Sequence, residues 1–191
     1  ITKMEKNNSF LINYYNNLKK LLSASSADID KMLKVQEILK KIKKKNKKVL
    51  IFGNGGSASI ASHVSVDLIK NVKIKCINFN EANLLTCFSN DFGYENWMKK
   101  AIEYYGEKGD ALIVISSSGQ SPNVNKAVLA AKNKRFSKII TLTGFKKNNP
   151  LRLKGDINFW VDSKVYNYVE NIHQIILLSI VDLLTSNLKN K

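Results

Sequence analysis

Two segments of the sequence combine glycines and hydroxyls in an order that suits an anionic ligand. The segment from Gly53 to Ser57 reads GNGGS; it follows an apolar run and leads into a helical pattern. Its glycines permit a tight turn and let backbone N–H groups at the helix start approach a ligand closely. The segment from Ser116 to Ser121 follows another apolar run and carries four serines, whose hydroxyls can donate to phosphate oxygens. Pro122 suits the first position of the next helix, with Ser121 as its cap.

This pattern predicts a phosphate monoester bound by hydroxyls and a helix N-terminus, without arginine. Two alternatives remain open for the glycine segment. It matches the weak dinucleotide fingerprint G-x-G-x-x-A, and Glu81 then stands where such a fold needs an acidic residue. A tight turn without any ligand would use the same glycines. The dinucleotide alternative leaves the serine segment without a role.

Strand and helix patterns alternate around these two segments. Because the strand-like runs are continuously apolar, they predict a parallel sheet that helices cover on both faces, in one doubly wound domain. Ligands of such sheets bind beyond the carboxyl ends of the strands, so the loops after Phe52, Ile115 and Leu142 are the candidates. The expected strands are 48–53, 74–79, 111–116, 138–143 and 157–161, and the expected helices are about 57–70, 95–105, 122–133 and 165–187.

Residues 4–45 carry two amphipathic helical patterns ahead of the sheet, and Asp28 is a plausible cap for the second. The inner faces predicted by the spacing are Phe10, Tyr14, Leu18, Leu21 and Leu22 for the first helix, and Ile29, Met32, Leu33, Gln36, Leu39 and Ile42 for the second.

The net charge of +16 raises the question of a nucleic-acid partner. The charge is nearly all lysine, Arg135 and Arg152 being the only arginines, whereas base readout and bidentate phosphate contacts favour arginine. We therefore expect a solvated lysine surface and no nucleic-acid partner. No run approaches the ~20 apolar residues of a membrane span. Cys76 and Cys87 lack metal-ligand spacing, and together with the polar start of the chain they predict a cytoplasmic protein.

Three stretches carry a resemblance to a known family: GNGGSASIASH at 53–63, SNDFGYE at 89–95 and SSSGQSPNV at 116–124. From about residue 30 to 185 the chain resembles the phosphoheptose isomerases of the sugar isomerase (SIS) family. The resemblance implies a flavodoxin-like three-layer sandwich with a five-stranded parallel sheet and N-terminal helices. It implies a single SIS domain over 1–191, with a helical extension at 1–45 and an α/β core at 46–187. It further implies a homotetramer that converts sedoheptulose 7-phosphate to heptose 7-phosphate for bacterial surface polysaccharide.

The resemblance also assigns roles to residues. The phosphate would be held by Ser116, Ser117, Ser118 and Ser121. The sugar would be lined by Asn54, Gly55, Gly56, Ser57, Asn90, Asp91 and Glu170. On sequence alone, Asn90 and Asp91 read as an ordinary turn before Gly93.

The chain departs from the family where the proton chemistry is expected. Family members carry a histidine and a glutamate four residues apart after GNGGS, and a glutamine and a histidine eight apart on the last helix; some bind zinc with these groups. Here the pairs are His63 with Asp67, and Glu170 with Leu178. The resemblance makes Asp67 and His63 the catalytic residues, and His63, Asp67 and Glu170 the ligands of any zinc.

Leu178 can neither transfer a proton nor bind a metal. Two hypotheses therefore stay open: an aldose–ketose isomerase, and a non-catalytic SIS module that binds a phosphosugar or a partner protein, as the DnaA initiator-associating proteins do. His173 lies one helical turn after Glu170, and a packed structural histidine is the simpler interpretation of it.

Overall fold

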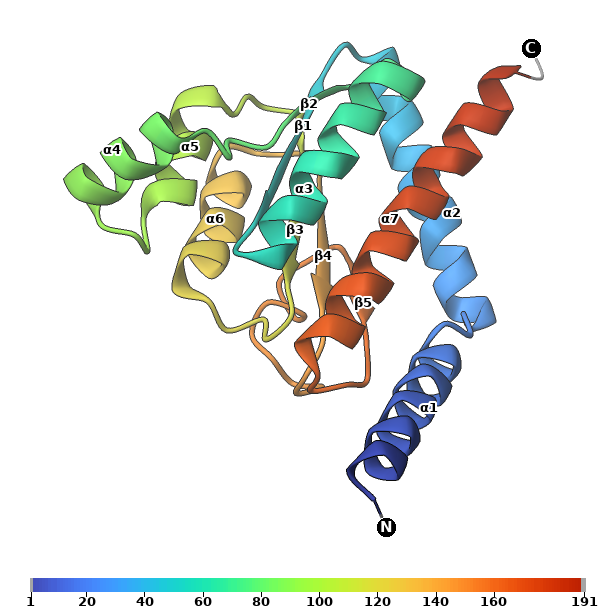
Figure 1. Cartoon of the computed structure of the whole chain (residues 1–191). Helices are drawn as coiled ribbons and strands as arrows, with labels where there is room; N and C mark the ends of the chain where they lie inside the picture. Colours follow the sequence, from blue (N-terminus) through green and yellow to red (C-terminus); the bar gives the residue numbers. More distant parts are fainter. Residues whose placement is uncertain (1, 190–191) are drawn as a thin grey trace.

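The computed structural model describes residues 2–189, and the first and the last two residues of the predicted domain lie outside this range. It is an α/β sandwich around one five-stranded parallel sheet of order β2-β1-β3-β4-β5 (Figure 1). The strands are β1 (Lys48–Gly53), β2 (Lys75–Ile77), β3 (Ala111–Ser116), β4 (Lys138–Thr143) and β5 (Ile157–Trp160). The helices are α1 (Lys3–Leu21), α2 (Ser26–Lys44), α3 (Gly56–Asp67), the π-helical η1 (Leu68–Val72), α4 (Ala82–Phe92), α5 (Trp97–Tyr105), α6 (Pro122–Asn133) and α7 (Tyr166–Lys189).

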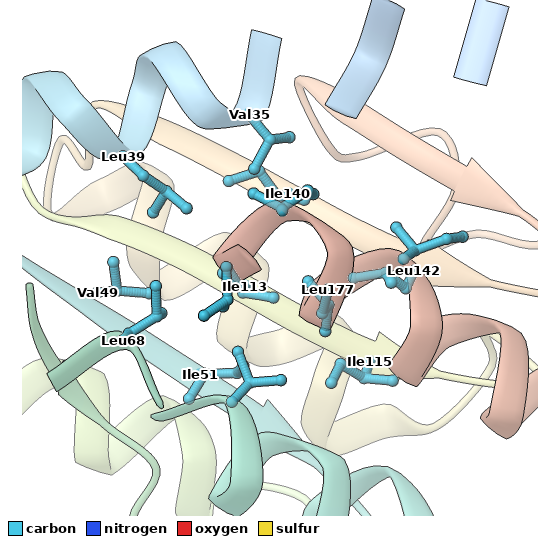
Figure 2. Close-up of a cluster of buried hydrophobic side chains, with 14 of the residues drawn as sticks. Val35, Leu39, Val49, Ile51, Leu68, Ile113, Ile115, Ile140, Leu142 and Leu177 are labelled. Atoms are coloured by element: carbon cyan, nitrogen blue, oxygen red, sulfur yellow. The ribbon is translucent and has the colours of Figure 1, made fainter. Parts of the chain in front are cut away.

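Each face of the sheet has its own apolar core, because successive strand residues point to opposite sides. One face packs against α2, α3 and α7, and Figure 2 shows Ile113 beside Leu177 and Val49 beside Leu68 there. The other face carries Leu50, Phe52 and the residues that alternate with them, and it packs against α5 and α6. The predicted three-layer fold is confirmed.

Parallel pairing brings the carboxyl ends of β1 and β3 together. Gly53 pairs with Ile115 at that edge, so the glycine segment and the serine segment leave the sheet side by side. The third candidate loop, after β4, is joined to the serine segment by a hydrogen bond from the Gly144 N–H to the Ser117 carbonyl at 2.9 Å. The loops expected to bind a ligand therefore share one edge.

The predicted strands β1, β3 and β4 and the helix α6 match the structure to the residue, whereas α4 was not predicted. Asn90 and Asp91, expected in a turn, lie in the last turn of α4. None of the residues of α4 in the described structure is buried, so the sequence has no buried apolar stripe that would predict this helix. The predicted cap of α2 was also wrong. Ser25 is the N-cap and accepts from the Asp28 N–H at 3.2 Å.

The amphipathic pattern of the first helices is only partly used within the chain. Leu18 and Leu21 pack against the core, but Phe10 is 66% exposed and, in the part of the chain that the structure describes, α1 has no buried residue. In α2, Leu39 and Ile42 are buried as predicted, whereas Ile29 and Leu33 are exposed. In Figure 1, α1 lies beyond the N-terminal end of α2 and points away from the sheet.

The expectation that no segment could span a membrane needs one correction. By length and composition alone α7 passes that test, with a mean hydropathy of 1.2 over Tyr166–Leu188. Its apolar side contributes Val169, Leu177 and Val181 to the core that covers the sheet. Packing against the sheet therefore accounts for this composition.

Candidate functional site

The glycine segment forms the turn from β1 into α3. Gly55 has φ +55°, a left-handed conformation that suits glycine, and it is the residue before the first turn of α3. The Ser57 N–H donates to the Asn54 carbonyl at 3.0 Å and closes the turn. No side chain caps this helix start within the described residues. The turn therefore presents backbone donors and the positive end of the α3 dipole at the ligand edge.

The side chain of Asn54 is held by two partners from other elements. Asn54 and Asn123 exchange hydrogen bonds between their amides, at 3.1 and 3.0 Å, and the Tyr94 hydroxyl donates to Asn54 Oδ1 at 3.0 Å. Asn123 is 1% exposed and lies in the first turn of α6. The stretch SSSGQSPNV contains Asn123, but its spacing offered no sign of this contact. Asn123 and Tyr94 thus fix the amide that was predicted to face a sugar.

The serine segment is a tight loop between β3 and α6. The Gly119 N–H donates to the carbonyl and the hydroxyl of Ser116, at 3.1 and 3.2 Å, and the Gln120 N–H donates to the Ser118 hydroxyl at 3.2 Å. Two of the four serines, Ser116 and Ser117, are buried. The backbone of the loop is therefore held by its own residues and by its neighbours.

Two of the hydroxyls are not used by the fold. The Ser117 hydroxyl is buried and has no hydrogen-bond partner among the described residues. Ser121 stands at the N-cap of α6 as predicted, but its side chain makes no capping hydrogen bond. An unpartnered buried hydroxyl costs free energy unless something binds it. Next to a helix N-terminus, an anionic oxygen is a suitable partner.

Glu170 of α7 lies against the glycine turn. A Cβ at Gly56 would meet the Glu170 carboxylate, so a larger residue at this position would push the end of that side chain aside. The neighbouring residue Val169 packs against Gly144, beside the Ser117 carbonyl. Desolvation by burial raises the pKa of Glu170 above its ordinary value. The carboxylate predicted to line the sugar is thus at the ligand edge.

The seam between α3 and α7 continues from Gly56 to His63. One turn beyond Glu170, Gln174 Nε2 lies 3.3 Å from His63 Nδ1, and His63 Nε2 lies 3.4 Å from an Asp67 oxygen. If the Gln174 amide donates to Nδ1, the proton of a neutral His63 is on Nε2 and points at Asp67. Gln174 was not predicted, although its position four residues after Glu170 on α7 was a usable signal.

A scan against protein families matches the SIS domain model over residues 13–144. The chain belongs to the SIS domain family. It is 36% identical to the phosphoheptose isomerase of Fusobacterium nucleatum over 156 residues, which are 78% of this chain and 78% of that protein. It is 38% identical to the phosphoheptose isomerase of Thermodesulfovibrio yellowstonii over 152 residues, 76% of this chain and 75% of that protein.

Solved structures agree on the fold. A phosphoheptose isomerase from Francisella tularensis superposes with a TM-score of 0.83 over 97% of this chain and 100% of that one, at 24% identity. A phosphoheptose isomerase from Neisseria gonorrhoeae gives a TM-score of 0.80 over 96% and 99%, also at 24% identity. The flavodoxin-like SIS architecture predicted from the sequence is therefore confirmed.

The SIS domain does not assemble the predicted metal set within one chain. Among residues 2–189, no group of three histidine, cysteine, aspartate or glutamate side chains could hold a metal ion. Asp67 lies beside His63, but Glu170 faces Gly56, seven residues and about 10 Å along α3 from His63. The set of His63, Asp67 and Glu170 therefore does not fit zinc in this chain, and we derive no step through a metal.

The remaining predicted residues have other surroundings in the SIS domain. Leu178 is partly buried against the core. Asn90 and Asp91 are exposed and bonded to each other at 3.0 Å, and Tyr94 instead reaches Asn54. Glu81, the acidic residue of the dinucleotide alternative, caps α4 by accepting from the Leu84 N–H at 3.0 Å.

His173 has a structural environment, as its simpler interpretation predicted. It is fully buried, and its Nε2 lies 3.0 Å from the Thr143 carbonyl at the end of β4. Burial lowers the pKa of His173 to about 4. The ring is therefore neutral at pH 7, and it joins α7 to the strand that ends beside the serine segment.

Proposed function

We propose that this SIS domain is a phosphosugar isomerase that interconverts sedoheptulose 7-phosphate and heptose 7-phosphate. The observation that carries the proposal is the buried Ser117 hydroxyl, which has no hydrogen-bond partner among residues 2–189, near Ser121, whose side chain makes no capping bond at the N-terminus of α6. Such a loop is built for a phosphate monoester. The identity to phosphoheptose isomerases over more than three quarters of the chain supports this choice of substrate.

Each residue of the proposal has a distinct task. The phosphate is held by Ser116, Ser117, Ser118 and Ser121. The sugar is oriented by the backbone from Gly55 to Ser57 and by the side chain of Asn54. Aldose–ketose isomerisation moves a proton between adjacent carbons through an enediol, and it needs a base for the carbon and an acid for the oxygens. We assign the base to Asp67, oriented by its contact with His63 at 3.4 Å. Asn90 and Asp91 remain proposed sugar contacts.

Asp67 lies eleven residues, about 16 Å, along α3 from Gly56, so in one chain it does not reach the sugar beside the serine segment. We propose that a second copy supplies it in a homotetramer. The apolar side chains of α1 support this assembly, since Phe10, Leu11 and Tyr15 are 66%, 54% and 68% exposed. Analytical ultracentrifugation tests it: a monomer at micromolar concentration contradicts the assembly. A zinc ion bound at His63 and Asp67 would likewise need ligands from another copy.

The reaction is tested by proton NMR of sedoheptulose 7-phosphate with the protein in deuterium oxide. We expect a new heptose 7-phosphate signal and deuterium at the carbon beside the carbonyl. No turnover and no deuterium incorporation would exclude an isomerase of this sugar. We further propose that the chain is a single SIS domain over 1–191 that acts in the cytoplasm and serves bacterial surface polysaccharide synthesis, as its resemblance to phosphoheptose isomerases implies.

Leu178 favours a second candidate, a non-catalytic module that binds phosphosugars or a partner protein. An apolar side chain occupies the position where the family pattern has a proton-transferring histidine, and it packs on the core. This candidate predicts thermal stabilisation by sedoheptulose 7-phosphate without turnover. Activity that appears only in Leu178→His would support it, whereas turnover by the native chain excludes it.

A further inference from the structure

Glu170 is a carboxylate without a partner in a chain that is rich in cations. The chain has 31 lysines and arginines against 15 acidic residues. Even so, Glu170 makes no hydrogen bond and no ion pair with any residue from 2 to 189 that meets the usual distance limits. Its side chain is instead packed against Gly56, at a point where any larger residue would displace it. Close packing without a counter-ion is costly for a charged group, and it favours the protonated acid.

The segments that meet at the ligand edge contain hardly any ionisable groups. Residues 53–66, which form the glycine turn and α3 up to the turn of Asp67, contain His63 and no other ionisable side chain. Residues 111–125, which form β3, the serine segment and the start of α6, contain none. On α7, residues 165–181 contain Glu170, His173 and the two tyrosines, and His173 is fully buried and neutral. Glu170 is therefore the one acid of ordinary strength in these segments.

The contacts of Glu170 put it within reach of a sugar whose phosphate lies in the serine segment. Its carboxylate borders Gly56 of the glycine turn, and Val169 beside it packs on Gly144, which is bonded to Ser117. A phosphosugar anchored at Ser117 and passing Asn54 would cross this position. Burial raises the pKa of Glu170 above its ordinary value, the direction that favours the protonated acid.

From this geometry we propose that Glu170 is a catalytic acid–base residue, which exchanges protons with the two reacting oxygens of the sugar. The inference rests on the proposed isomerase function. Leu178 cannot transfer protons to or from the sugar oxygens. The proposal assigns this proton transfer to Glu170, which lies eight positions earlier on the same helix. The carbon-bound proton remains the task of Asp67, which the second copy supplies.

The proton transfers balance without any further reactant. In the aldose-to-ketose direction Asp67 takes the proton from C2, the electron pair of that bond forms C1=C2, and the C1 carbonyl oxygen takes a proton from the Glu170 acid. The enediol then gives its O2 proton to the Glu170 carboxylate as C2=O forms, and the proton on Asp67 goes to C1. Both carboxyl groups end as they began.

The test replaces Glu170 by glutamine, which keeps the shape and removes the acid. We expect kcat for sedoheptulose 7-phosphate to fall about 10²- to 10⁴-fold, the usual contribution of general acid–base catalysis. Calorimetry should find the affinity for this sugar unchanged or higher, since a carboxylate near the phosphate is removed. Glu37→Gln, at an exposed pair with Lys40 on α2, is the matched control and should keep full activity.

The pH profile separates catalysis from a structural role. Because the acid form starts the cycle, the native kcat should fall as the pH rises through the pKa of Glu170, and Glu170→Gln should lose this limb. Glu170→Asp, which retracts the acid by one methylene, should give an intermediate kcat and keep the limb. If Glu170→Gln keeps native kcat and its alkaline limb, the inference is overturned while the isomerase stands. If the native chain itself shows no turnover, both fall.

Discussion

The serine segment and the α3–α7 seam start at the same edge of the sheet, but they use their polar side chains differently. In the serine segment the Gly119 and Gln120 N–H groups are bonded within the loop, and the buried Ser117 hydroxyl has no hydrogen-bond partner among residues 2–189. Along the seam the polar groups bond to one another, with His63 between Gln174 and Asp67, and Leu178 packs on the core. The first region keeps a hydroxyl available for a ligand, whereas most polar side chains of the second region bond within the chain.

The difference indicates that phosphosugar binding and proton chemistry are separable properties of this fold. A loop that keeps free donors at a helix N-terminus can bind an anion, whichever residues line the α3–α7 seam. Proton transfer needs an acid or base that is free at the reacting atoms. Glu170 is the seam residue that remains free, so variants can be chosen that disturb one region and leave the other intact.

The largest expected effect is the pH dependence of stability caused by the buried His173 of α7. The pKa of His173 is lowered to about 4, so the unfolded chain, whose histidine has an ordinary value, binds more protons below pH 6.5. The stability from this neutral histidine is complete above pH 6.5 and is lost as the pH falls toward 4, up to ~3 kcal/mol of unfolding free energy. Urea unfolding at pH 4.5, 5.5 and 7 measures it. His173→Gln should flatten this slope; equal slopes in the native and variant proteins would contradict the assignment.

The next effect concerns the paired amides of Asn54 and Asn123, which join the glycine segment to α6. Asn123→Ala removes both amide bonds to Asn54 and leaves a cavity in α6, so we expect the unfolding free energy to fall by about 2 kcal/mol. The affinity for sedoheptulose 7-phosphate should weaken as well, because the Asn54 amide is no longer held. Asn133→Ala, at the far end of the same helix, is the control. Native affinity in a folded Asn123→Ala protein would separate Asn54 from the sugar site.

A single hydroxyl distinguishes a binding group from a structural one. Ser117→Ala removes a group without a protein partner, so the unfolding free energy should stay the same or rise slightly, while Kd for the phosphosugar rises about tenfold. Ser116→Ala removes one of the two acceptors of the Gly119 N–H and should lower stability by up to ~1 kcal/mol. Thermal unfolding with and without ligand measures both. The reverse order of stabilities would mean that the fold, and no ligand, uses the Ser117 hydroxyl.

The smallest effect is at the rim of the site. Tyr94→Phe removes the hydroxyl that donates to Asn54 but keeps the ring, and Tyr94 is 58% exposed. We expect a two- to fivefold rise in Kd or KM and no measurable change in stability. Tyr104→Phe, also exposed, is the control. A loss as large as that of Asn123→Ala would give Tyr94 a direct contact with the substrate.

Much of the fold follows from the sequence because the strands are short, apolar and bounded by glycine and serine. Four of the five expected strands end within one residue of the observed ends, and Pro122 marks the start of α6. The helix α4 was not predicted because it has no buried apolar stripe and because its last turn contains Asn90 and Asp91, residue types that favour turns. Its cap, Glu81, had instead suggested a dinucleotide site.

The site was predictable where residue types alone define a chemistry. Glycines and serines after strands marked both loops, and the resemblance assigned the serines to phosphate. Two partners from other elements were not visible, because Asn123 and Tyr94 reach the site through packing that no local spacing records. Contacts between elements likewise place Glu170 on Gly56 and keep it from His63 and Asp67.

The central claim, that the serine segment binds the phosphate of a sugar, is tested most directly by calorimetric titration. Sedoheptulose 7-phosphate and unphosphorylated sedoheptulose are each titrated into the native chain and into the Ser117→Ala/Ser118→Ala/Ser121→Ala variant. We predict that the native chain binds the phosphorylated sugar alone and that the triple variant binds it at least about 100-fold more weakly, with its fold intact by circular dichroism. Equal affinity of both proteins for sedoheptulose 7-phosphate would contradict the claim.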